Sequence, residues 1–159
     1  MTRKEQYNQL ILQIAELIKD ETNLVGILAN VSAALHDTFP ERFFWVGFYL
    51  QVHGNMLRLG PFQGSVACYT IPFGKGVCGK AWEEGRTLIV PDVEKFPGHI
   101  ACSSLSRSEI VVPMYDDSHT FRGVLDIDST RLNDFNEDDK EGLERIIELL
   151  MEETQDLFQ

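Results

Sequence analysis

The amino-acid sequence predicts an α+β fold, in which an antiparallel sheet carries helices on one side. Apolar residues recur at helical spacing near the N-terminus and again near the C-terminus. Between these regions, short runs rich in aromatic and β-branched residues alternate with turn-forming residues. No change in composition marks a second domain, so we expect the 159 residues to form a single domain spanning 1–159.

Three amphipathic helices are expected at the two ends of the chain. The first has its apolar stripe within residues 10–18, and the second has its stripe within residues 24–35. The third begins near residue 137, where Asn136 is placed to cap it. Acidic residues in its first turn suit the positive end of the helix dipole. These helices are predicted to cover one face of the sheet.

The middle of the chain is expected to supply the strands. They are predicted over residues 43–52, 56–59, 68–72, 87–90, 109–115 and 121–129. The glycine-rich run 60–79 indicates loops around its one short strand, and a short helix is expected over 80–84. Residues 91–107 indicate a long ordered loop, and loops of this length in compact domains are often functional.

The charge of the chain excludes two classes of partner. Its 14 basic and 25 acidic residues give a formal net charge of −11. Nucleic-acid binders and proteins that dock on anionic membranes need basic surfaces, so neither partner is expected. The longest strongly apolar run covers only residues 43–50, and no secretory signal is evident at the start. We therefore expect a cytoplasmic protein.

Acidic side chains of two strands are candidates for one functional cleft. Asp126 and Asp128 point to the same side of the last strand, with their Cα atoms about 7 Å apart. They form either a solvated strand face or a carboxylate wall that meets a cation, an ammonium group or a metal. Glu109 is either an exposed strand-end residue or a third member of this wall. In a shared cleft, mutual repulsion would raise the pKa of at least one carboxyl and make it a candidate general acid.

The cysteines suggest redox chemistry rather than metal binding. Cys68, Cys78 and Cys102 contain no close pair of the kind found in structural zinc sites, and we expect neither a metal nor an organic cofactor. One of them, Cys78, fits a small buried apolar residue. Two loop cysteines that meet would form a redox pair, in which one attacks and the other resolves. His99 is a conceivable thiol base, although no orienting group accompanies it.

Three segments together carry a family resemblance. They are GPFQGSVACYTIPFGKGVCGKAW, VPDVEKFPGHIACSSLSRSEIVVP and GVLDIDS. In these motifs the chain resembles the free methionine-(R)-sulfoxide reductases, a branch of the GAF-domain family. The resemblance implies a six-stranded antiparallel sheet, N- and C-terminal helices on one face, a ligand pocket on the other, and a homodimer. It also implies thioredoxin-dependent reduction of free L-methionine (R)-S-oxide to L-methionine, a reaction that counters oxidative stress.

The resemblance also assigns roles to the three cysteines. It implies that Cys102 is the nucleophile and that Cys68 is the principal resolving cysteine. It implies that Cys78 is an auxiliary thiol that exchanges into the disulfide. Attack of the Cys102 thiolate on the sulfoxide would leave a sulfenic acid, which a second thiol condenses to a disulfide.

The remaining site residues are assigned in the same way. Glu109, Asp126 and Asp128 resemble the carboxylates around the sulfoxide and the amino group of the substrate. Trp45 and Tyr49 resemble the aromatic wall beside its methyl group. Two alternative functions share the same fold, because a fold does not determine a function. One is a non-catalytic GAF module that binds a small molecule, and the other is a thiol-based redox sensor.

Overall fold

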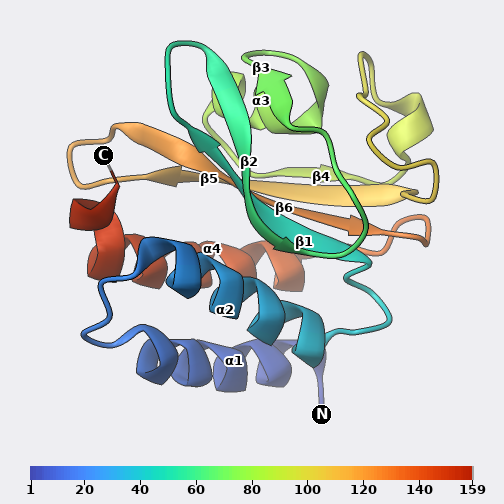
Figure 1. Ribbon diagram of the computed structural model, residues 1–159. Coiled ribbons are helices and arrows are strands. Elements are labelled where there is room, and N and C mark those ends of the chain that lie inside the picture. Colours follow the sequence, from blue (N-terminus) through green and yellow to red (C-terminus); the bar gives the residue numbers. More distant parts are fainter. Residues whose placement is uncertain (159) are drawn as a thin grey trace.

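The computed structural model describes residues 1–158 and has three layers (Figure 1). The helices are α1 (Arg3–Ile18), α2 (Leu24–Thr38), α3 (Gly76–Glu84) and α4 (Glu137–Thr154), with 3-10 turns η1 (Val93–Lys95) and η2 (Gln155–Leu157). The strands are β1 (Trp45–Gln51), β2 (Met56–Gln63), β3 (Thr70–Pro72), β4 (Leu88–Val90), β5 (Ser108–Tyr115) and β6 (Phe121–Ser129). Within residues 1–158, no helix is long and apolar enough to cross a membrane.

The strands form one six-stranded sheet in the order β3-β2-β1-β6-β5-β4, with antiparallel neighbours throughout. Helices α1, α2 and α4 lie below the sheet in Figure 1, whereas α3 and the long loops lie above it. Helices α2 and α4 contact the sheet, and α1 packs against both of them. This arrangement confirms the predicted α+β fold, the antiparallel sheet and the helices on one face.

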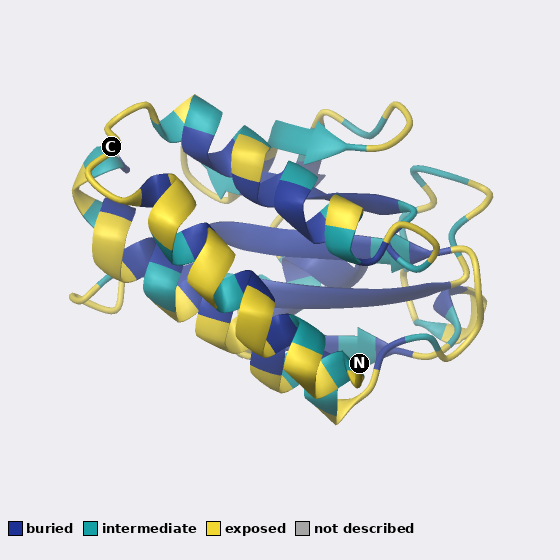
Figure 2. Cartoon of the chain, turned by 90° about the horizontal axis from the view of Figure 1, so that it is seen from below, coloured by how far each residue is buried: buried dark blue, intermediate teal, exposed yellow. Residues whose placement is uncertain are grey.

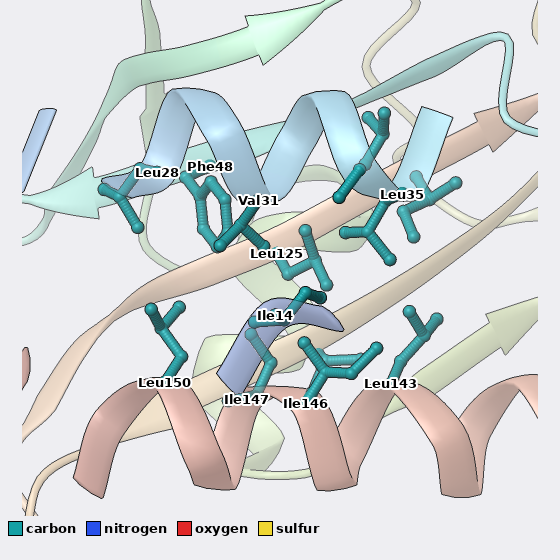
Figure 3. Close-up of a cluster of buried hydrophobic side chains, with 14 of the residues drawn as sticks. Ile14, Leu28, Val31, Leu35, Phe48, Leu125, Leu143, Ile146, Ile147 and Leu150 are labelled. Atoms are coloured by element: carbon teal, nitrogen blue, oxygen red, sulfur yellow. The ribbon is translucent and has the colours of Figure 1, made fainter. Parts of the chain in front are cut away.

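Two apolar clusters occupy the two faces of the sheet. The larger one packs α1, α2 and α4 against alternate strand residues such as Val46 and Phe48 (Figure 3). The helices turn buried stripes toward the sheet and exposed stripes outward (Figure 2). The smaller cluster contains Trp45 and Tyr49 on the opposite face. The period-two alternation of β1 therefore separates the structural core from the face that is free to build a site.

A buried carboxylate ties the first helix to the last. Asn136 caps α4 as predicted, accepting hydrogen bonds from the backbone of the first turn. In that turn, Asp139 is fully buried and lies 2.8 Å from the Arg3 guanidinium and 2.9 Å from that of Arg42. The Tyr7 hydroxyl donates a further hydrogen bond to it at 2.7 Å. These paired charges hold the helical layer together without contributing to the other face of the sheet.

Three strand boundaries differ from the prediction by two residues or more. Strand β3 begins at Thr70 rather than at residue 68, so Cys68 precedes it. Strand β1 begins at Trp45 rather than at residue 43, because the Phe43 backbone N–H still bonds the carbonyl of Phe39 in the turn after α2. Strand β2 continues past residue 59 to residue 63, following a register shift opposite Gly47. A Cβ at Gly47 would lie 2.2 Å from the Cβ of Phe62, so this close strand approach depends on glycine.

Helix α3 begins at Gly76, earlier than the predicted residue 80. The glycine-rich sequence suggested a loop, but Gly79 lies inside the helix. A Cβ at Gly79 would lie only 2.6 Å from the carbonyl oxygen of Pro72. This glycine therefore permits the helix to pack closely on the chain that follows β3, and it does not form a turn. The early start of α3 buries Cys78 beside the sheet.

Candidate active site

The sheet register brings the predicted acidic residues together. On the paired strands β1 and β6, Trp45 lies opposite Asp128 and Gly47 lies opposite Asp126. On β5, Glu109 lies opposite Asp128. Because directly paired residues point to the same side of a sheet, all three carboxyl groups project from the face that the helices leave uncovered. The predicted carboxylate wall is therefore present as a cluster on this face.

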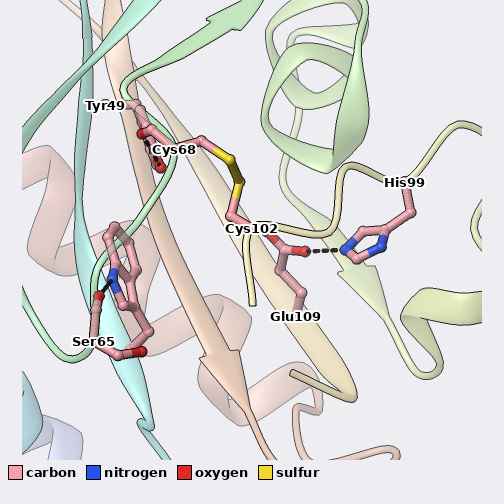
Figure 4. Close-up of a disulfide and its surroundings, with 7 residues drawn as sticks. Tyr49, Ser65, Cys68, His99, Cys102 and Glu109 are labelled. Atoms are coloured by element: carbon pink, nitrogen blue, oxygen red, sulfur yellow. Dashed lines mark hydrogen bonds and ion pairs between the residues drawn. A yellow bond between two sulfur atoms is a disulfide. The ribbon is translucent and has the colours of Figure 1, made fainter. Parts of the chain in front are cut away.

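A disulfide joins Cys68, just before β3, to Cys102 in the loop before β5 (Figure 4). The two residues are 34 positions apart in the chain, and their Cα atoms are 5.4 Å apart. Cys78 is the free cysteine and is only 3% exposed. The spacing left open which cysteines would meet, and the structure pairs the two that lie in loops.

A pocket lies between the disulfide-bearing loops and the acidic face of the sheet. Its walls include every predicted site residue except Cys68, which is bonded to Cys102: Trp45, Tyr49, Cys78, Cys102, Glu109, Asp126 and Asp128. With the disulfide formed, the free volume inside is about 40 Å³. A volume of this size holds a few water molecules, because one water needs about 10–15 Å³ on the same measure.

The environment of the acidic cluster favours the protonated form of its carboxyls. Glu109 and Asp126 are buried, and Asp128 is partly buried. Burial raises the pKa of all three carboxyls well above the usual range, and the neighbouring carboxyls raise it further. The carboxyl of Asp128 raises the pKa of Glu109, and that of Glu109 raises the pKa of Asp126. The pocket therefore favours a protonated carboxyl that can donate to a bound ligand.

One carboxylate oxygen in the pocket has no protein partner. Among the described residues, Asp126 Oδ1 is buried and accepts no hydrogen bond. A buried acceptor without a donor is unfavourable by about 1–3 kcal/mol, so such atoms usually mark a place where a ligand or water belongs. The atom is suited to a donor carried by the ligand, and an ammonium group is the strongest such donor.

His99 also lines the pocket, from the loop that carries Cys102. Its Nε2 lies 3.7 Å from Oε1 of Glu109 (Figure 4). Burial lowers the pKa of the imidazole, which favours its neutral form. The structure therefore places His99 beside Glu109. The only sequence signal for the contact between His99 and Glu109 was the position of His99, three residues before Cys102.

The aromatic wall is anchored to the segment that carries Cys68. The Trp45 ring stacks on Tyr49 at 5.9 Å between centroids and on Phe62 at 5.1 Å. Its indole N–H donates to the carbonyl of Ser65 at 3.0 Å, and the Tyr49 hydroxyl donates to the carbonyl of Cys68, also at 3.0 Å. These hydrogen bonds fix the aromatic rings relative to the disulfide.

The ligand atoms of Cys78, Glu109 and Asp126 lie within 4.8 Å of one another, so by distance alone they could hold a metal ion. Metal ligands must be deprotonated. Burial raises the pKa of the Cys78 thiol as well as those of the two carboxyls, which favours their protonated forms over the deprotonated forms that a metal requires. The arrangement therefore favours a proton donor over a metal centre.

The fold and the pocket together define an α+β domain with a pocket beside a disulfide-bonded cysteine pair. The sequence matches the family described as GAF domain over residues 20–151, and the chain belongs to that family. This match confirms the family to which the sequence motifs point. It also agrees with the six-stranded sheet and the pocket on the face opposite the helices.

Several relatives share nearly the whole length of the chain. It is 56% identical to GAF domain-containing protein A of Dictyostelium discoideum, covering 94% of this chain and 92% of the relative. It is 42% identical to the free methionine-R-sulfoxide reductase of Saccharomyces cerevisiae, with coverages of 94% and 86%. A solved structure of the free methionine-R-sulfoxide reductase of Neisseria meningitidis with its substrate superposes with a TM-score of 0.93 at 46% identity, over 98% of this chain and 92% of that one. The resemblance to this branch is confirmed.

Proposed function

We propose that this protein reduces free L-methionine (R)-S-oxide to L-methionine. The observation that carries the proposal is that Cys102 shares a pocket with three carboxyls whose pKa values are raised by burial. A sulfoxide oxygen leaves only when it is protonated, so the reaction needs a sulfur nucleophile and an acid on the same substrate. The names of the Saccharomyces and Neisseria relatives support the same reaction.

The chemistry proceeds in two steps within the chain. The thiolate of Cys102 attacks the sulfoxide sulfur while Glu109 donates a proton to the oxygen. The oxygen passes to Cys102 as a sulfenic acid, which oxidises that cysteine by two electrons and releases methionine. The thiol of Cys68 then attacks the sulfenic sulfur and expels water. This step forms the disulfide seen between these two residues.

Binding of the free amino acid follows from the remaining groups. The unpartnered Oδ1 of Asp126 accepts a hydrogen bond from the substrate ammonium, and Asp128 supports it. A residue within a peptide has an uncharged amide at this place and loses the charge-assisted contact. Trp45 and Tyr49 pack against the S-methyl group, because sulfur and its methyl group are polarizable and favour aromatic contacts.

Each turnover leaves the Cys68–Cys102 disulfide, which must be reduced before the next one. Thioredoxin reduces the disulfide, and Cys78 serves as an auxiliary thiol that exchanges into it. Because Cys78 is buried, it exchanges only after the loops around α3 open. The protein acts in the cytoplasm as a homodimer. Light scattering in solution can test the dimeric state.

A thioredoxin-coupled assay of NADPH oxidation tests this function. The substrates are free methionine (R)-sulfoxide, its (S) epimer and a peptide-bound sulfoxide. We expect turnover with the free (R) epimer alone. Binding without turnover would instead support a non-catalytic small-molecule module. Reversible disulfide formation without sulfoxide reduction would support a redox sensor.

A further inference from the structure

Exposed apolar side chains flank both ends of the disulfide. Val66 is 88% exposed and Tyr69 is 77% exposed, more than any other large apolar side chain within residues 1–158. They lie on either side of Cys68. Leu105, three residues after Cys102, is 60% exposed. Large apolar side chains that gather at one place on a surface commonly mark a protein contact.

The two segments that carry the disulfide are also free of charge. Residues 59–74 and 96–106 contain no Asp, Glu, Lys or Arg, although such residues make up 25% of the chain. Exposed cations border both segments: Arg58, Lys75, Lys95 and Arg107. None of the four makes an ion pair within residues 1–158. In a chain of net charge −11, both segments that carry the disulfide are therefore uncharged, and the residue next to each of their ends in the sequence is a cation.

We propose that this surface, which we call the disulfide face (Val66, Tyr69 and Leu105 with the four bordering cations), docks an acidic protein dithiol of the thioredoxin class. The inference rests on the proposed function, in which the disulfide must be reduced after each turnover. The thiol of a partner protein can reach a disulfide sulfur only when the partner's surface contacts the residues around that sulfur. The partner that reduces the disulfide must therefore contact the disulfide face, and the bordering cations complement an acidic partner.

The geometry also assigns the sulfur that the partner attacks. Cys102 and Val66 line the substrate pocket, whereas Cys68 does not line it and is followed by Tyr69, which is exposed outside the pocket. The partner's thiolate attacks Sγ of Cys68 and breaks the disulfide, and Cys102 leaves as a thiolate that takes up a proton. The partner's second thiol loses its proton and attacks the mixed disulfide, which releases Cys68. Two electrons pass to the protein, and the partner becomes a disulfide.

Substitution on the disulfide face, with two reductants compared, tests the proposal. The double variant Tyr69→Ser/Leu105→Ser removes apolar contacts without touching a pocket residue. We expect its kcat/KM for thioredoxin to fall about tenfold or more, since each lost contact of a docking centre contributes more than about 1 kcal/mol. Turnover driven by dithiothreitol should stay within about twofold of the unsubstituted protein. Val52→Ser, at a residue 51% exposed after β1, is the matched control and should change neither rate.

Two outcomes of this comparison contradict the docking proposal. One is an unchanged kcat/KM for thioredoxin, and the other is an equal loss with dithiothreitol, which would indicate a general structural defect. Reduction of the oxidised protein by thioredoxin can be followed without any sulfoxide, by thiol alkylation and mass. Docking can therefore be measured even if no sulfoxide is reduced. Absence of sulfoxide reduction would overturn the proposed function and would leave the docking proposal unaffected.

Trapping of the mixed disulfide tests the attacked sulfur. A thioredoxin whose second active-site cysteine is replaced by serine stalls after its first attack. We expect peptide mapping of the trapped complex to place the bond at Cys68, and a yield that falls as ionic strength rises. A bond at Cys102, or a yield independent of salt, would contradict the proposed approach over a cationic border.

Discussion

Glu109 on β5 and Asp128 on β6 are direct cross-strand partners, and both side chains project into the pocket that Cys102 lines. Two carboxylates placed opposite each other repel, and burial disfavours the charge on each. Burial is the main cause of the raised pKa of Glu109, and Asp128 is the next. The pair therefore favours a bound proton near the nucleophile, which is what reduction of an S=O bond requires.

Replacing Glu109 by glutamine should remove the proton donor while keeping the shape of the side chain. We expect kcat to fall by a factor of about 10²–10⁴, the usual range for general acid catalysis. Activity of the unsubstituted protein should decline as pH rises through the raised pKa of Glu109, and this decline should be absent in Glu109→Gln. Steady-state rates across pH measure both effects. A kcat within about threefold of the original would exclude Glu109 as the donor.

The same substitution should change how stability depends on pH. Below the ordinary carboxyl pKa, the folded and unfolded chains both hold the proton. Above it, the unfolded chain loses protons that buried Glu109 retains, so the free energy of unfolding falls as pH rises toward the raised pKa. Each pKa unit corresponds to about 1.4 kcal/mol.

We therefore expect the Tm of Glu109→Gln, relative to the original protein, to rise between pH 5 and pH 8. The rise should be about 2–4 °C for each kcal/mol that is relieved. Thermal unfolding at several pH values provides the measurement. Glu148→Gln, on the exposed side of α4, is the matched control and should show no such rise. A Tm difference that stays constant with pH would show that Glu109 does not retain its proton in the folded protein.

Asp126→Asn should weaken binding of the free amino acid. Its unpartnered Oδ1 is assigned to the substrate ammonium, and hydrogen bonds to charged groups contribute about 1.5–3 kcal/mol. The expected result is a KM for free methionine (R)-sulfoxide raised by a factor of roughly 10–150. The N-acetylated sulfoxide, which has no ammonium group, should be a poor substrate of both proteins. An unchanged KM for the free amino acid would assign its ammonium to another group.

The oxidised protein should bind product poorly. With the disulfide formed, the free volume in the pocket is about 40 Å³, enough for only a few water molecules. Methionine is the suitable probe, because it is not consumed by the thiols. Calorimetry should show binding to the reduced protein and affinity at least about tenfold lower for the oxidised protein. Equal affinities would mean that the disulfide does not close the pocket.

Local patterns in the sequence were sufficient to predict much of this site. The period-two alternation of β1 and β6 correctly predicted that Trp45 and Tyr49 share one face, and that Asp126 and Asp128 share one face. The depth of the acidic cluster was left open, because burial of Glu109 depends on what packs above the sheet.

Contacts between residues that are far apart in the chain could not be predicted from the sequence alone. Spacing of the three cysteines did not determine which two would meet, since the pairing depends on how the loops before β3 and β5 approach each other. The contact of His99 with Glu109 and the unpartnered oxygen of Asp126 arise in the same way. The start of α3 was missed because Gly79 meets a packing requirement rather than a turn requirement.

In the proposed mechanism, Sγ of Cys102 accepts the oxygen from the substrate. A single-turnover measurement tests this step directly: each reduced variant is mixed with excess free methionine (R)-sulfoxide, without reductant, and the methionine released is counted. Cys68→Ser should release about one equivalent per site and then stop, because Cys102 is then oxidised and no reductant is present to restore its thiol. Cys102→Ser should release none, and release of about one equivalent per site by Cys102→Ser would contradict the mechanism.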